Sequence, residues 1–447
     1  MSFHDRYSHL FRSHIKCFGD QARLYIKGLF QADKKNMERI EERVPETQYE
    51  NLQYFLSEAR WNAQAVNNQI ARDVDRHLGG HPDSGLYIDE TGFPKKGKMS
   101  VGVSRQWCGR LGKTDNCQVG VFAVLGRDKY ATALDCRLYL PKVWVDDPDR
   151  CRKAKVPEED IVFKTKPELA LEMVDNARAN GVRFNWVGCD GLYGQTPWFL
   201  RELDKMGEIF VADVHCDQRI YLDDPNPYVP ERKSNRGRKP ENLKARTKAI
   251  RVDKWLAEQP DEAWQRIAVR DSSKGVLQVD AIRRKVWVWD NQEPEAQQWD
   301  LIVRREVNAS DTIKYSLTNA PDTTNLQRLA YMQAQRYWVE RTFQDGKSQC
   351  GMGEYQARGW FAWHHHMTLV MMAQLFMLEE RLLHKESVSL LSTSDITTLL
   401  QHFLPRRDVD EDEVLRQLEL RHRKRQASID SAYRKQGNLL NNGRLLI

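Results

Sequence analysis

Residues 184–194 read FNWVGCDGLYG and indicate the class of fold. The first six form a short, mostly apolar segment, typical of a strand that ends before a glycine-containing turn. The sequence predicts a helix upstream, since Pro167 stands near its start, apolar residues recur on one stripe and Gly181 follows its end. Residues 198–206 predict another helix, and residues 209–213 predict another apolar strand. Strands on either side of a crossover helix favour an α/β fold with a mixed sheet.

The residues before this unit change their periodicity at a turn-rich segment, 79–85. Residues 21–78 carry apolar residues at helical spacing, which predicts a small helical domain. Residues 86–89, 118–125 and 130–140 then have the character of strands and are joined by short links. They predict an antiparallel meander.

A β-rich segment follows the core. Between residues 216 and 320, short apolar runs separated by polar turns predict several strands. Residues 231–251, within this segment, hold nine basic and two acidic residues. The predicted divisions are a helical N-terminal domain (1–80), the first part of the core (81–215), a β-rich insertion with a basic stretch (216–320), the second part of the core (321–385) and a helical basic tail (386–447).

The composition excludes several classes of protein. A chain of 447 residues with 40% hydrophobic residues is neither a miniprotein nor a disordered protein. Its eight cysteines form no CxxC pair, which argues against a zinc site and favours a reducing compartment. The first thirty residues lack the apolar stretch of a signal peptide, and the apolar run 367–378 is too short to span a bilayer. We therefore expect a cytoplasmic protein without membrane segments.

Two aspartates stand at the ends of predicted strands. Asp89 ends the strand 86–89, and Asp190 ends the strand 184–189. Divalent cations such as Mg²⁺ prefer carboxylate oxygens, which different elements can bring together at one spot. Glu90 is expected on the opposite face of its strand, which leaves Asp89 as the better ligand. Acidic residues at strand ends are also common as turn formers, so neither aspartate is specific alone.

A third carboxylate lies in the segment RYWVERTFQDGK, residues 336–347. On a helix, Arg336, Glu340 and Lys347 would point within roughly 40° of one another, since each residue turns the helix by about 100°. One face would then carry a carboxylate beside two cations, which suits metal and phosphate together. The alternative is a surface ladder of salt bridges. Gly346 weakens the helix prediction close to Lys347.

These residues resemble those of the DDE transposases of bacterial insertion sequences, in the branch marked by a Tyr, Arg, Glu, Lys signature. Arg336, Glu340 and Lys347 match three of its four positions, whereas the Tyr position falls on Gln333. The similarity extends over about residues 20–380. Three further segments are similar to that group and occur in its order: YIDETGF (87–93), SVGVSRQW (100–107) and GKTDNCQ (112–118).

The resemblance implies an RNase H-like catalytic core interrupted by the β-rich insertion. It also implies that Asp89, Asp190 and Glu340 are catalytic and bind metal, while Arg336 and Lys347 contact DNA phosphate. The implied cofactors are two Mg²⁺ ions, or Mn²⁺ in their place. The implied function is that of a DDE transposase, an endonuclease that cuts DNA at insertion-sequence ends and joins the 3′ hydroxyl to target DNA.

The same resemblance implies the partners and the location of the protein. The partners would be double-stranded DNA, both as terminal inverted repeats and as target, and a second copy of the chain assembled on it. The protein would lie in the bacterial cytoplasm, associated with the nucleoid when bound to DNA. The helical N-terminal domain is expected to bind the terminal repeats, by analogy alone.

Positive charge is concentrated locally, because the net charge is only +6. The basic stretch, with Arg236, Arg238 and Lys239, is expected to contact DNA phosphates, as is the cluster 421–425. A solvated loop or helix face is the alternative for each cluster.

Two other sets of side chains are compatible with a ligand but fit a packing role better. Trp287 and Trp289 lie two apart on a predicted strand, so they face the same side and could stack a base, although core packing is the more common role. His364–His366 are consecutive in a helical segment, where side chains diverge by about 100° and cannot converge on one ion.

Two other functions share part of this pattern. A transposase-derived repressor without activity would bind DNA through the same basic residues, but the presence of all three carboxylates argues against it. A glycoside hydrolase also uses paired carboxylates. The basic clusters make a sugar substrate a poor fit.

Overall fold

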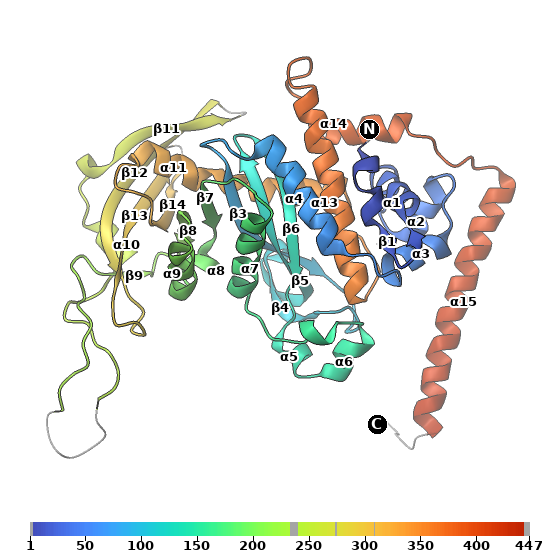
Figure 1. Ribbon diagram of the computed structural model, residues 1–447, viewed down its shortest axis with the longest axis horizontal. Coiled ribbons are helices and arrows are strands. Elements are labelled where there is room, and N and C mark those ends of the chain that lie inside the picture. The colour runs from blue at the N-terminus through green and yellow to red at the C-terminus, as the bar shows by residue number, and fades with distance from the viewer. Residues whose placement is uncertain (1–2, 233–239, 273–274, 308, 442–447) are drawn as a thin grey trace.

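The computed structural model describes residues 3–232, 240–272, 275–307 and 309–441. In this part of the chain, ten strands form one large sheet, which crosses the centre of Figure 1. The strand order is β11-β12-β13-β14-β8-β7-β3-β5-β4, and β6 also pairs with β5. Helices flank this sheet, so the fold is mixed α/β, as predicted.

The first strands of the core form the predicted meander. Antiparallel pairing joins β3 (Gly85–Pro94) to β5 (Lys113–Arg127), and β5 to both β6 (Tyr130–Leu138) and β4 (Ser104–Cys108). On its other side, β3 pairs in parallel with β7 (Trp186–Cys189), which pairs in parallel with β8 (Phe210–Val214). The sheet is therefore mixed.

The parallel strands depend on crossover helices, because a short hairpin cannot connect them. The helix α7 (Lys166–Ala179) lies between β6 and β7 in the chain. Its start is fixed by a capping box, in which the Thr165 hydroxyl accepts a hydrogen bond from the Glu168 backbone and the Glu168 carboxylate accepts one from the Thr165 backbone. Another helix, α9 (Pro197–Lys205), connects β7 to β8 after the short α8 (Gly191–Gly194).

The strands of the 216–320 segment continue the core sheet. They are β11 (Gln265–Ser272), β12 (Gly275–Val288), β13 (Gln297–Glu306) and β14 (Ala309–Thr318). β14 pairs antiparallel with β8, with Leu317 opposite Ala212. These strands thus extend the same sheet that carries Asp89 and Asp190. Arg236, Arg238 and Lys239 lie outside the described residues.

The N-terminal helices share their core with the rest of the protein. The helices α1 (Gly19–Gln31), α3 (Tyr49–Ser57) and α4 (Ala63–Leu78) pack against α13 (Trp360–Leu383), and α4 also packs on β6 (Figure 1). A single hydrophobic cluster extends from these helices through the sheet to α13. Residues 3–80 are therefore mostly helical and share this core with the rest of the described chain, and their role in DNA binding stays a prediction.

The apolar run 367–378 lies in the middle of α13, where most of its side chains are buried. Its hydrophobicity is explained by contacts on several sides, with the N-terminal helices and with the sheet. Among the helices of the described ranges, none combines the length and the apolar character needed to cross a bilayer.

The C-terminal helix α15 (Glu411–Asn441) lies beside the N-terminal helices in Figure 1. The Arg421 guanidinium contacts the Glu42 carboxylate at 2.6 Å, and the Lys424 ammonium lies 3.1 Å from the centre of the Tyr49 ring. Two members of the basic cluster 421–425 are thus used in contacts within the chain, which reduces the charge that this cluster offers to DNA.

The histidines and tryptophans singled out from the sequence have packing roles in this structure. His365 stacks on Trp61, with ring centres 3.8 Å apart, and both of its ring nitrogens face backbone carbonyl oxygens. Trp289 is buried and donates a hydrogen bond to the Glu293 carbonyl, whereas Trp287 is half-buried.

The remaining elements are α2 (Met37–Arg43), α5 (Lys142–Val145), α6 (Pro148–Lys153), α10 (Val252–Ala257), α11 (Leu326–Gln335), α12 (Tyr337–Gln349), α14 (Thr393–Phe403), β1 (Arg12–Ser13), β2 (Lys16–Cys17), β9 (Arg219–Ile220) and β10 (Ile250–Arg251).

Candidate active site

Asp89 and Asp190 come together because their strands are parallel neighbours. Ile88 of β3 lies opposite Cys189 of β7, so the next residue along each segment is an aspartate. Asp190 directly follows β7, whereas Asp89 lies in the middle of β3, because pairing with β5 continues that strand to Pro94 and not only to the predicted end at Asp89. Asp190 also caps α8, since its carboxylate accepts a hydrogen bond from the Leu192 backbone at 3.0 Å. The local sequence thus fixes the position of both carboxylates.

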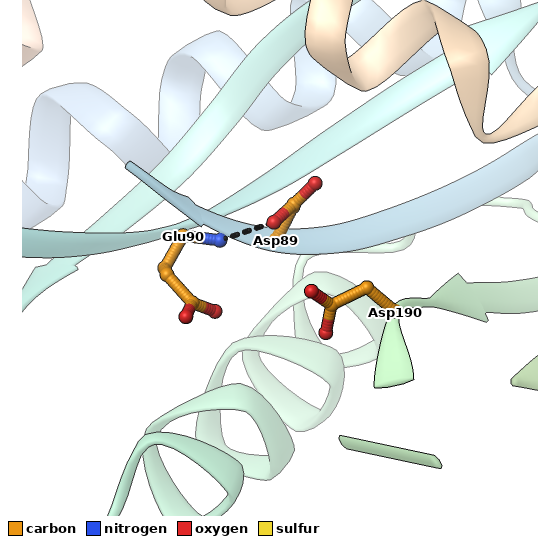
Figure 2. A group of neighbouring side chains, drawn as sticks. All are labelled: Asp89, Glu90 and Asp190. Atoms are coloured by element: carbon orange, nitrogen blue, oxygen red, sulfur yellow. Dashed lines mark hydrogen bonds between the residues drawn. The ribbon is translucent and has the colours of Figure 1, made fainter. Parts of the chain in front are cut away.

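Glu90 joins these two aspartates, contrary to the prediction from strand periodicity. One carboxylate oxygen each from Asp89, Glu90 and Asp190 lies within 4.8 Å of the others. Figure 2 shows Asp89 and Glu90 leaving β3 on opposite sides, while Asp190 points between them. Because Asp190 follows the end of β7, its side chain is not confined to one face of the sheet and can approach both. The opposite-face argument therefore does not exclude Glu90 as a ligand.

Two neighbours hold the Glu90 carboxylate. The Lys166 ammonium lies 2.8 Å from one of its oxygens, and the Tyr193 hydroxyl donates a hydrogen bond to the other at 3.0 Å. Lys166 begins the crossover helix α7, and Tyr193 belongs to α8. The glutamate is thus oriented by the elements that flank β7.

Arg336 links the predicted carboxylates of the site. Its guanidinium contacts Asp89 at 3.0 Å, Asp213 at 3.2 Å and Glu340 at 3.1 Å. Arg336 is the residue between α11 and α12, so the helix pair directs its side chain at the edge of the sheet. Glu340, on α12, has a half-exposed side chain and lies outside the cluster of Asp89, Glu90 and Asp190. Of the predicted triad, Asp89 and Glu340 are therefore connected through this guanidinium, and Asp190 meets Asp89 in the carboxylate cluster.

Asp213 is a site residue that the sequence interpretation missed. It belongs to β8, contacts Arg336 and accepts a hydrogen bond from the Ser316 hydroxyl of β14 at 2.6 Å. The signal was present in the sequence, because Asp213 ends an apolar strand as Asp89 and Asp190 do. It required the further knowledge that β8 lies next to β7.

Crowding of acidic groups changes their proton affinity. Burial, followed by the nearby charges of Asp190 and Glu90, raises the pKa of Asp89 to about 8, although Arg336 acts in the opposite direction. Burial and the charge of Glu90 also raise the pKa of Asp190. The three carboxylates are thus costly to ionise together, and a cation placed among them would relieve that cost.

Lys347 lies close to the site without contacting its carboxylates. Its ammonium donates a hydrogen bond to the Thr91 hydroxyl of β3, two residues after Asp89. Burial lowers the pKa of this lysine to about 8. The structure thus places Arg336 and Lys347 on the side of α12 that faces β3, as the helical spacing predicts.

The donor set fits a hard divalent cation. Asp89, Glu90 and Asp190 offer carboxylate oxygens within a small volume, and Mg²⁺ and Mn²⁺ prefer such ligands. Burial and neighbouring negative charge raise the pKa values of Asp89 and Asp190, so a cation beside these two carboxylates would favour their ionised form. The arrangement can therefore hold metal and, through Arg336 and Lys347, a phosphate group beside it.

Comparison with known proteins agrees with this chemistry. Residues 14–276, more than half of the chain, match the family described as DDE superfamily endonuclease. The matched range includes Asp89, Glu90, Asp190 and Asp213, and ends before Arg336, Glu340 and Lys347.

One curated relative and one solved structure show how far the similarity extends. The chain is 25% identical over 228 residues to the probable transposase for insertion sequence element IS701 of Microchaete diplosiphon, a match that covers 50% of this chain and 56% of that protein. The NurA nuclease from Sulfolobus solfataricus aligns over 72% of this chain and 92% of its own, with 11% identity and a TM-score of 0.22, which is too low to inform the fold. From the match over residues 14–276, the chain belongs to the DDE superfamily endonucleases.

Proposed function

We propose that this chain is a DDE transposase of the branch with the Tyr, Arg, Glu, Lys signature, which cuts DNA at insertion-sequence ends and joins the 3′ hydroxyl to target DNA. The observation that carries the proposal is the meeting of Asp89, within β3, and Asp190, directly after the adjacent parallel strand β7, beside Arg336. The probable transposase with 25% identity supports the same function.

The strand pairing supports an RNase H-like core for this function. An antiparallel meander of β6, β5 and β3 is followed by β7 and β8, both parallel to β3. We propose that residues 81–215 and 321–385 form this core, that residues 216–320 are an insertion that extends its sheet, and that residues 1–80 bind terminal repeats. Residues 386–447 would form the basic tail.

In the proposed reaction, Asp89, Asp190 and Glu340 hold two divalent cations, Mg²⁺ or Mn²⁺, with Glu90 as a further oxygen donor. When bound, such ions activate a water molecule and stabilise the leaving 3′ oxygen of a phosphodiester. Arg336 and Lys347 orient the scissile phosphate and balance its charge. Glu340 is half-exposed and adjacent to Arg336, so transfer of that guanidinium to a phosphate would free the carboxylates for metal.

The proposed partners are two kinds of double-stranded DNA and a second copy of the chain. Terminal inverted repeats would be cut and target DNA would receive the cut ends, and two ends would be paired by a dimer. The protein would act in the bacterial cytoplasm at the nucleoid. The basic stretch with Arg236, Arg238 and Lys239 would add sequence-independent affinity for the DNA backbone.

A cleavage assay tests this proposal. Purified protein is incubated with DNA carrying the inverted repeats that flank its gene, with Mg²⁺, with Mn²⁺ and with EDTA. Wild type should nick this DNA only with metal, and Asp190→Asn should lose at least about a hundredfold in rate, because a metal ligand supplies several kcal/mol of transition-state stabilisation. The control Asp149→Asn changes an aspartate on α6 whose side chain is 81% exposed, and should cut normally.

The outcome also separates the proposal from a silent repressor. Binding of the repeat DNA without any cleavage in either metal would favour the repressor. Cleavage that survives Asp190→Asn would refute the assigned site.

A further inference from the structure

A basic cavity lies beside α12 and does not include the carboxylate cluster of Asp89, Glu90 and Asp190. It has a volume of about 740 Å³ and is bounded by α12, the end of α13, β11, the turn between β5 and β6, and the start of α14. We call it the α12 pocket. No member of the carboxylate cluster lines it, so it is distinct from the candidate active site.

The α12 pocket has an excess of positive charge. Its basic lining residues are Lys129, Arg270, Arg341 and Arg381, and its acidic ones are Asp271 and Asp345. Arg341 contacts Asp345 at 3.1 Å. Within the described ranges, neither Arg270 nor Arg381 has an acidic partner at ion-pair distance. An anion is therefore the ligand that the pocket chemistry favours.

Three buried donors of the pocket have no hydrogen-bond partner within the part of the chain that the structure describes. They are the Nε atoms of Arg270 and Arg381 and the indole Nε1 of Trp338. A buried donor without a partner costs about 1–3 kcal/mol, and more when it belongs to a charged group. Burial also lowers the pKa of Arg381. The pocket wall thus carries positive charge that its own acceptors do not balance, and an anion in the pocket would balance it.

Aromatic rings hold the two unpaired arginines in place. The Arg270 guanidinium lies 4.9 Å from the centre of the Tyr337 ring and 5.2 Å from that of Trp338, and the Arg381 guanidinium lies 5.1 Å from that of Tyr130. Such stacking restricts a guanidinium while leaving its N–H edge for a planar or tetrahedral oxyanion. The pocket is thus prepared for phosphate rather than for a simple halide ion.

The α12 pocket and Glu340 occupy adjacent sides of one helix. At about 100° per residue, Arg341 is turned by about 100° and Asp345 by about 140° from Glu340 around α12. A nucleic-acid strand that passes Glu340 can therefore continue around the helix towards the pocket.

We infer that the α12 pocket binds a backbone phosphate of the DNA on which the enzyme acts, with Arg270 and Arg381 as its ligands and Trp338 as an additional donor. This inference rests on the proposed function, since it assumes that DNA is the substrate. The pocket would hold the strand outside the site of chemistry and contribute affinity independent of base sequence.

The test measures DNA binding in the presence of EDTA, where no cutting occurs. The full chain is titrated into fluorescent repeat DNA at several salt concentrations. Arg270→Gln and Arg381→Gln should each weaken binding by about tenfold and reduce the slope of log affinity against log salt by about one, as expected for a lost phosphate contact. Arg381→Lys should recover part of the affinity. Arg152→Gln is the matched control, because Arg152 is an exposed arginine on α6, which lies at the end of the molecule away from α14 in Figure 1.

A second pair of variants avoids any effect on folding. Leu390 lines the α12 pocket and its side chain is almost fully exposed, at 87%. Leu390→Glu should place a negative charge at the mouth and weaken DNA binding, whereas Leu390→Gln should not. A third titration with a nucleoside triphosphate in place of DNA identifies the source of the phosphate.

These measurements separate the possible failures. If the chain binds no DNA at all, the proposed function fails. If it binds DNA and all pocket variants match Arg152→Gln, only the pocket inference is refuted. If the pocket variants lose triphosphate affinity while their DNA affinity is unchanged, the pocket serves a small phosphate ligand and the inference is likewise refuted.

Discussion

Replacing Asp89 by asparagine should stabilise the metal-free protein at alkaline pH while removing a metal ligand. The carboxylate is buried beside Asp190 and Glu90, and its pKa rises from the usual 3.8 to about 8. A carboxyl group with a raised pKa contributes stability that is complete below its unfolded pKa and is lost as the pH rises through its folded pKa. Asparagine cannot ionise, so it should avoid that loss.

The structure gives the size of the effect. Each unit of pKa difference corresponds to about 1.4 kcal/mol, so ionisation of Asp89 should lower the free energy of unfolding by about 5 kcal/mol at pH 8. Asparagine would exchange the hydrogen bond from the Arg336 guanidinium to a carboxylate, formed at 3.0 Å, for a weaker one from the same guanidinium to an amide oxygen. That exchange should cost about 1.5–3 kcal/mol. The net gain should be about 2–3 kcal/mol at pH 8, and it should vanish near pH 5.

Urea unfolding followed by tryptophan fluorescence measures this difference in the presence of EDTA. The exposed Asp149→Asn control should change the free energy of unfolding by less than about 0.5 kcal/mol at either pH. Added Mg²⁺ or Mn²⁺ should stabilise wild type more than Asp89→Asn, because ligand binding to the folded state raises its stability. An asparagine variant that is less stable than wild type at pH 8, or a difference that does not change with pH, would refute the electrostatic account of the site.

Two further predictions concern neighbouring residues. Burial lowers the pKa of Lys347 to about 8, so the affinity of wild type for DNA should fall as the pH rises from about 7 to 9. Lys347→Arg should keep its affinity over this range, because arginine stays protonated. Equal losses of affinity for the two proteins in a fluorescence-anisotropy titration would contradict a phosphate contact by Lys347. A Cβ added at Gly194 would collide with the Asp213 backbone carbonyl, so Gly194→Ala should lower the free energy of unfolding by about 2–3 kcal/mol and impair cleavage. The control is Gly437→Ala on α15, where an added Cβ meets no other atom of the described residues, and it should raise the free energy of unfolding by about 0.5–1 kcal/mol. Equal melting temperatures for Gly194→Ala and Gly437→Ala would show that the described position of α8 is wrong.

The part of the site that the sequence predicts is the part that local rules determine. Asp89 and Asp190 each follow an apolar run, and a crossover helix between the two runs makes their strands parallel, so their meeting follows from local pattern and handedness. The predicted end of the first strand at Asp89 is wrong, because pairing with β5 continues β3 to Pro94. The helical spacing of Arg336, Glu340 and Lys347 predicts that they share one face, and the structure shows that Arg336 and Lys347 contact β3. These inferences need only the periodicity of side chains along each predicted helix or strand.

The rest depends on contacts between distant segments. Strand periodicity places the side chains of Asp89 and Glu90 on opposite sides of β3, but it does not show that Glu90 lies at the site. Asp190 follows the end of β7 and points between the two side chains, so it approaches both carboxylates. Asp213 follows an apolar run, but the position of β8 next to β7 is set by non-local pairing, so the contact of Asp213 with Arg336 could not be predicted. The break between α11 and α12 at Arg336 likewise depends on packing rather than on propensity.

The pairing of β14 with β8 limits how far this protein can be shortened. Without residues 216–320, β8 would have an open border of unpaired backbone N–H and C=O groups directly beside Asp213. Such a border favours association with other chains at the place where the proposed DNA substrate would enter. A shortened derivative would therefore need a substitute strand that pairs with β8. Deletion of residues 216–320 without such a strand should give a protein that aggregates.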